Sequence, residues 1–111
     1  MSLSSHVLDA VRGRPARGVR IRWERQHAGQ WELVADAVTD DDGRVGDWGG
    51  HVPTTEGLHR LLFDSGGYFA GQGSKTFYPE VIIVFEVVDA DAHHHVPLLL
   101  SPFAYSTYRG S

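Results

Sequence analysis

The strongest constraint on the fold is a hydrophobic period of two that recurs along the chain. Between residues 19 and 25, apolar Val19, Ile21 and Trp23 alternate with arginines. Successive side chains of a strand point to opposite faces, so this segment is typical of a strand with one buried face. No stretch carries a helical period over three turns, and this argues against a helix-rich fold.

Other segments share this strand character and are bounded by turn-forming residues: 7–11, 31–38, 57–64, 96–102 and 103–108. The β-branched stretch 80–88 is expected to be a central strand. The glycine-rich segment 65–73 has room for at most a single helical turn. The pattern predicts an all-β sandwich of seven to eight strands with one short helical turn.

Size and charge limit the classes of function. A chain of 111 residues is expected to form one domain, 1–111, with a thin core that makes oligomerisation plausible. A net charge of −4, with Lys75 as the single lysine, argues against a nucleic-acid partner. The longest apolar run, 81–85, is far too short to span a membrane, and no secretory start is visible, so we expect a cytoplasmic protein. The absence of cysteine excludes disulfides and thiolate chemistry.

Seven histidines are many for a chain of this length, and three of them are consecutive at 93–95. On a strand, His93 and His95 face one way and His94 the other, so the run offers only two metal ligands together. The Asp40–Gly43 turn lacks the ligand spacing of a calcium loop. We therefore predict no metal and no cofactor. His27, His51 and His59 are interpreted as turn or surface residues.

Several motifs occur together over the whole length of the chain: Ser5–Asp9, Gly13–Ala16, Thr39–Asp40, Asp42–Arg44, Tyr78–Val81, His95–Pro102 and Tyr105–Ser111. In combination they closely resemble the 5-hydroxyisourate hydrolase family, the transthyretin-like enzymes of purine breakdown. The terminal Tyr-Arg-Gly-Ser is the most specific motif, because it separates these enzymes from the hormone carrier transthyretin. His94 stands where the family usually has tyrosine, at a position expected to face away from the site.

The resemblance implies a transthyretin-like (prealbumin-like) sandwich that opens the six-membered ring of 5-hydroxyisourate with water. The product would be 2-oxo-4-hydroxy-4-carboxy-5-ureidoimidazoline, formed without a cofactor. The catalytic residues carried over by motif are His6, Arg44, His95 and Ser111. The substrate-binding residues carried over are His6, Arg44, Tyr108, Arg109 and Gly110.

These residue types suit ring opening by water. Histidine supplies a general base near neutral pH, and arginine is a fixed cation that can polarise a carbonyl. One of His6 and His95 would activate the water, and the other would orient it or protonate the leaving nitrogen. The terminal carboxylate of Ser111 could hold a histidine in the required tautomer.

The family resemblance also implies a homotetramer, a dimer of dimers with its sites where the dimers meet. The terminal segment 103–108 is a natural edge strand to pair with its copy. Three other classes of function stay open: a small-molecule carrier like transthyretin, an immunoglobulin-like interaction domain, and a histidine-based metal protein. A carrier favours an apolar channel, whereas His6, Arg44, His95 and Tyr108 would make a polar one.

Overall fold

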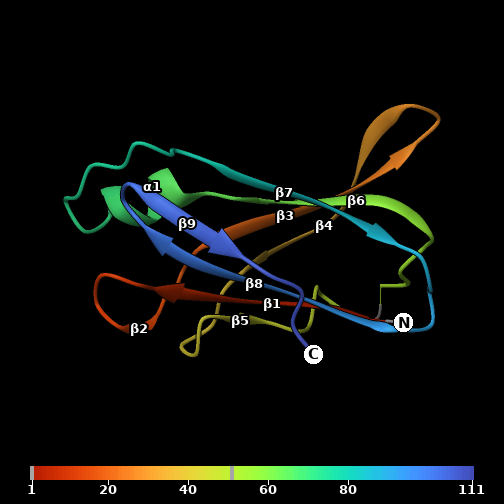
Figure 1. The fold of residues 1–111 in the computed structure, drawn as a ribbon, viewed down its shortest axis with the longest axis horizontal. Helices are drawn as coiled ribbons and strands as arrows, with labels where there is room; N and C mark the ends of the chain where they lie inside the picture. Colours follow the sequence, from red (N-terminus) through yellow and green to blue (C-terminus); the bar gives the residue numbers. More distant parts are fainter. Residues whose placement is uncertain (1, 51) are drawn as a thin grey trace.

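The computed structural model describes residues 2–50 and 52–111 and consists of two β-sheets packed face to face (Figure 1). The elements of the described chain are β1 (Ser2–Asp9), β2 (Arg14–Pro15), β3 (Arg20–His27), β4 (Gln30–Val38), β5 (Arg44–Val45), β6 (Gly57–Phe63), α1 (Ser65–Ala70), β7 (Val81–Val87), β8 (His93–Ser101) and β9 (Ala104–Thr107). The predicted all-β sandwich with one short helix is confirmed. The described chain has nine strands where seven to eight were predicted, and two of the nine, β2 and β5, are only two residues long.

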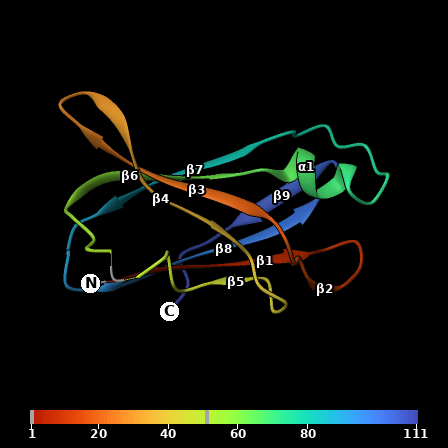
Figure 2. The same ribbon diagram turned by 180° about the vertical axis from the view of Figure 1, so that it is seen from behind.

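One sheet is built around a parallel pair of distant segments, β1 and β8, whose register aligns Ser2 with His93 and Asp9 with Leu100. β9 pairs with the other edge of β8, while β2 and β5 pair with different parts of β1. The second sheet is antiparallel in the order β4-β3-β6-β7. Figure 2 shows the two sheets from behind, with β1 and β8 in one layer and β3 and β6 in the other. The N-terminal residues therefore lie beside the histidine run.

The core lies between the sheets and follows the period of two. Leu98 and Leu100 of β8 are fully buried, as are Trp23 of β3 and Leu61 and Phe63 of β6. Burying an apolar side chain of this size contributes about 1.5–3 kcal/mol. The inward positions of the strands thus stabilise the sandwich, and the outward positions are left for other roles.

The position of β7 corrects one expectation. The β-branched stretch was expected to form a central strand, but β7 pairs with β6 alone among the described strands and forms a sheet edge. Its ends, Val81 and Val87, are buried, whereas Ile82 and Val84 are exposed on the outer face. Strand propensity measures how a side chain packs on a pleated surface, so it does not report whether both neighbours are present.

His59 corrects another expectation, because it lies in the core and not on the surface. Its Nδ1 accepts a hydrogen bond from Trp23 Nε1–H at 3.0 Å, and its Nε2–H donates to the Thr55 carbonyl at 2.6 Å. The ring stacks on Phe85 with centroids 5.7 Å apart. Burial lowers the pKa of His59, so the ring is kept neutral in a fixed tautomer. His27 is exposed, as expected, and His51 lies outside the described residues.

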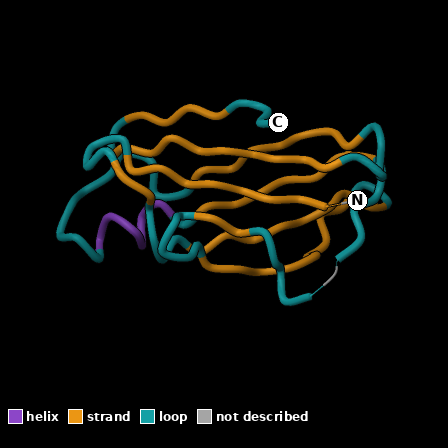
Figure 3. The backbone as a smooth tube through the Cα atoms, turned by 90° about the horizontal axis from the view of Figure 1, so that it is seen from below, coloured by secondary structure: helices purple, strands orange, loops and turns teal. Residues whose placement is uncertain are grey.

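The glycine-rich segment forms α1, a six-residue helix at one end of the sandwich (Figure 3). The Asp64 side chain caps it by accepting the Gly67 N–H at 2.9 Å. Tyr68 donates from its hydroxyl to Asp9 Oδ2 at 2.7 Å, which ties the helix to the end of β1. No helix within residues 2–50 and 52–111 is long and apolar enough to cross a membrane.

Candidate active site

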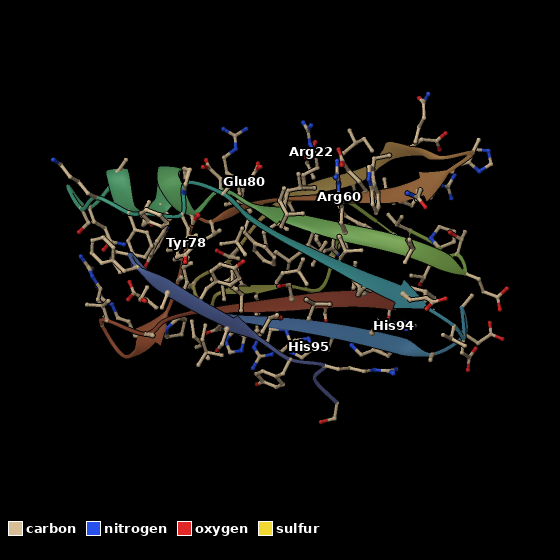
Figure 4. All side chains as sticks on the ribbon, turned by 45° about the horizontal axis from the view of Figure 1, so that its top comes forward. Arg22, Arg60, Tyr78, Glu80, His94 and His95 are labelled. Atoms are coloured by element: carbon tan, nitrogen blue, oxygen red, sulfur yellow. The ribbon has the colours of Figure 1, made fainter. Side chains whose placement is uncertain are left out.

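The outer face of the five-stranded sheet carries a polar row that follows from alternation on β1 and β8. On β1, Ser2, Ser4 and His6 are half-buried and point outward, while the residues between them are buried. On β8, His93 is exposed and His95 half-buried, whereas His94 is buried on the opposite face. The expected orientation of the three histidines is confirmed, and Figure 4 shows His94 and His95 on β8.

Arg44 is placed beside His6 by the tight turn that precedes β5. The Asp40 carboxylate accepts the N–H groups of Asp42 and Arg44, both at 2.9 Å. Gly43 has φ +73° and packs so closely on the Val7 carbonyl that a Cβ would overlap it. Its own carbonyl accepts the Val7 N–H at 2.8 Å. The turn is therefore fastened to β1.

The register of β5 on β1 sets Arg44 directly opposite His6. His6 Nε2 lies 2.9 Å from the Asp42 carbonyl oxygen. A carbonyl only accepts, so Nε2 carries the proton and donates. In the neutral ring, Nδ1 is then the nitrogen that can accept.

His95 is held from two sides. Its Nδ1 is hydrogen-bonded to Ser4 Oγ at 2.7 Å, and its carbonyl accepts the Gly110 N–H at 2.9 Å. Burial lowers the pKa of His95, and the neighbouring charges of Arg44 and of protonated His93 and His6 lower it further. A hydrogen bond with the Ser4 backbone opposes this. A ring with a lowered pKa is neutral at pH 7 and can accept a proton.

The remaining predicted residues belong to the C-terminal segment after β9. Tyr108 and Arg109 line a cavity of about 260 Å³ at the side of the sandwich, together with His94 and His95 of β8 and with Ile83 and Phe85 of β7. Ser111 is exposed, and within the described chain no hydrogen bond or ion pair joins it to His6 or His95. The structure thus brings together His6, Arg44, His95 and Gly110. Tyr108 and Arg109 share a cavity with His95, while Ser111 lies exposed beyond them.

Two residues of this surface had no assigned role in the sequence analysis. Ser4 contacts both His93 and His95, and His93 stacks on His95 with ring centroids 6.4 Å apart. The signal was present in the period of two, which places Ser4 on the same face as His6. The parallel pairing of β1 with β8 could not be read from that pattern. Within residues 2–50 and 52–111, no three His, Asp or Glu side chains gather as a metal site.

The fold and the arrangement of these side chains together define a transthyretin-like sandwich with a polar site of histidine and arginine on one outer face. The model of the HIUase/Transthyretin family matches residues 3–110. The chain is 43% identical over 114 residues to 5-hydroxyisourate hydrolase 2 of Rhizobium meliloti, covering 98% of this chain and 95% of that one.

Solved structures agree with this match. The structure of Klebsiella pneumoniae 5-hydroxyisourate hydrolase is similar with a TM-score of 0.88 at 34% identity, covering 100% of both chains. Sea bream transthyretin in complex with thyroxine has a TM-score of 0.92 at 33% identity, covering 99% of this chain and 95% of that one. The chain belongs to the HIUase/Transthyretin family. Curated relatives from Salmonella dublin, Pseudomonas aeruginosa and Mus musculus are named 5-hydroxyisourate hydrolase, and this chain is a hydrolase of that family.

Proposed function

We propose that this chain hydrolyses 5-hydroxyisourate to 2-oxo-4-hydroxy-4-carboxy-5-ureidoimidazoline in purine catabolism, without a metal or cofactor. The observation that carries the proposal is the convergence of His6, Arg44 and His95 on one polar outer face. The names of relatives from bacteria and mouse support the substrate. In this proposal residues 1–111 form one cytoplasmic domain.

His95 is the better placed general base. Its pKa is lowered by burial, so it is neutral at pH 7, and its Nδ1 is engaged by Ser4. Nε2 is then the ring nitrogen that takes a proton from water as the oxygen attacks the substrate carbonyl carbon. The ring C–N bond breaks in the following step. His6 orients the water or, when protonated, gives a proton to the leaving nitrogen.

Arg44 binds the polar substrate and stabilises the negative charge that develops on the attacked carbonyl oxygen. Its side chain is exposed beside His6, and its guanidinium stays charged across the working pH range. A lysine would supply a charge but not the planar pair of donors.

The terminal Tyr108-Arg109-Gly110-Ser111 segment completes the substrate pocket in this proposal. Gly110 lets the chain approach His95, while Tyr108 and Ser111 supply hydrogen bonds that fix the ring plane and the water. Tyr108 and Ser111 are exposed in the single chain, which supports an assembled site. We propose a homotetramer, a dimer of dimers with its sites at the dimer–dimer interface. Light scattering should then give about four times the 12.3 kDa chain mass, and a monomer at micromolar concentration would contradict this.

The decisive experiment mixes the purified protein with freshly generated 5-hydroxyisourate and follows its ultraviolet decay. We expect acceleration over the spontaneous rate, and a loss of about 10²–10⁴-fold in turnover for His6→Ala, Arg44→Ala and His95→Ala. His27→Ala is the matched control, since His27 is exposed at the end of β3 in the other sheet. A carrier of small aromatic ligands would bind the substrate without accelerating its decay.

A further inference from the structure

Four side chains on the outer face of the five-stranded sheet form one continuous hydrogen-bonded row. Ser2 Oγ is hydrogen-bonded to His93 Nδ1, and His93 Nε2 lies 3.0 Å from Ser4 Oγ. Ser4 Oγ in turn lies 2.7 Å from His95 Nδ1. Hydroxyls and imidazoles thus alternate from the exposed His93 to His95 in the candidate site.

The proton inventory of this row permits hydrogen bonds that all run in the same direction, either from His95 to Ser2 or from Ser2 to His95. Each serine hydroxyl has a single proton, and a neutral imidazole has one donor and one acceptor nitrogen. If His95 Nδ1–H donates to Ser4, the Ser4 hydroxyl donates to His93 Nε2, and His93 Nδ1–H donates to Ser2. In that state His95 Nε2 is unprotonated, as a general base requires.

We propose that this row is a proton relay, in which Ser4 and His93 carry the proton accepted by His95 away from the active site. The inference rests on the proposed function and deepens it. When a water proton arrives at His95 Nε2, the Nδ1 proton passes to Ser4 Oγ, and the Ser4 hydroxyl proton passes to His93 Nε2. His95 is neutral again, now with its proton on Nε2, and the positive charge lies on His93, which releases a proton to solvent. The resting tautomers return when His95 Nε2 loses that proton and Nδ1 takes one back through Ser4.

The surroundings of the two rings explain the direction of transfer. A protonated His95 faces the Arg44 guanidinium from β5, whose charge opposes it, and His93 and His6 oppose it further whenever they are protonated. His93 lies at the start of β8 with its side chain exposed to water. Its ring adds nothing to the core between the sheets, yet both of its nitrogens are used by serines of β1.

The kinetic test compares His93→Ala, Ser4→Ala and Ser4→Thr in the ultraviolet decay assay. We expect the two alanine variants to lower kcat by about tenfold with little change in KM, less than the loss of a group that itself exchanges protons with the reactant. Added imidazole should restore kcat in His93→Ala and leave the wild type unaffected. Ser4→Thr keeps the hydroxyl and should keep the rate, and His27→Ala serves as the control variant.

A substrate-free measurement separates this inference from the proposed function. Nitrogen-15 NMR of the histidine rings reads which nitrogen carries the proton, and we expect Nδ1–H on both His93 and His95. Ser4→Ala should redistribute the His95 tautomers and leave those of His59 unchanged. A wild-type His95 protonated on Nε2, or a His93→Ala variant with wild-type kcat and no response to imidazole, overturns the relay. A wild type that fails to accelerate the decay contradicts the proposed function alone.

Discussion

Gly110 lies directly against the imidazole of His95. Its N–H donates to the His95 carbonyl at 2.9 Å, and a Cβ at this position would overlap the Cδ2 atom of the ring. The penultimate residue of the chain therefore forms one wall of the space that the ring occupies. Together with Ser4 on the Nδ1 side, it fixes the plane of the imidazole.

Gly110→Ala should lower turnover strongly while leaving the fold intact. The added methyl group must displace either the chain end or the His95 ring, and a shift of about 1 Å at a reacting group costs about 10²-fold in rate. The ultraviolet decay assay measures this loss, and thermal unfolding measures the fold. Gly46→Ala is the control, because a Cβ at Gly46 meets nothing within 4 Å. Equal activity of both variants would show that the contact does not position His95.

Gly43→Ala should destabilise the protein and disturb Arg44. The residue has φ +73°, which costs about 1 kcal/mol or more for alanine, and its Cβ would overlap the Val7 carbonyl oxygen. We expect the free energy of unfolding in urea to fall by about 2–4 kcal/mol. The same Gly46→Ala variant should stay within about 0.5 kcal/mol of wild type. A small loss at Gly43 would mean that β5 can move off β1 without strain.

Acid should weaken the fold through the buried His59. Its pKa in the folded protein is lowered by burial, so between that value and the unfolded value of 6.5 the unfolded chain binds more protons. The contribution of neutral His59 to the free energy of unfolding is therefore complete above pH 6.5 and is lost as the pH falls through this window. His94 and His95, whose pKa values are also lowered by burial, act in the same direction.

Urea unfolding at pH 7.5 and pH 5 measures the effect, and His59→Phe should reduce the difference between the two. This variant leaves the Trp23 N–H without its acceptor, so it should also cost about 1–3 kcal/mol at pH 7.5. His27→Ala should leave the pH dependence as it is. A stability that rises from pH 7.5 to pH 5 would contradict the buried neutral state of His59.

Tyr68→Phe should loosen the connection between α1 and β1. Burial raises the pKa of the Asp9 carboxyl, but hydrogen bonds from Tyr68 and from the Arg12 and Val11 N–H groups lower it overall. Losing the hydroxyl should cost about 1.5–3 kcal/mol in urea unfolding at pH 7, with a smaller loss at pH values where Asp9 is protonated. Tyr105→Phe is the control, since Tyr105 is exposed on β9. Equal stability of both variants would rule out this contact as a support of α1.

Local pattern predicted much of the fold because a strand records in its sequence which face is buried. The alternation in 19–25 gave β3 and its inward Ile21 and Trp23. It was less informative where composition is ambiguous. The β-branched segment of β7 fits an edge as well as a centre, and His59 looks like any strand histidine until Trp23 is seen to donate to it. Burial of a polar side chain depends on a partner from another strand, and no local pattern records that partner.

The sequence by itself determined the all-β class and the opposite faces of His94 and His95. Through its motifs it also determined the family. Only the tertiary structure decided that β1 and β8 pair in parallel, so that Ser4 meets His93 and His95, residues about ninety positions away. It also decided that Gly110 closes on the His95 ring. A hydrophobic period of two fixes which face of the strand a residue lies on. The pairing of strands and their register depend on the packing of the whole chain.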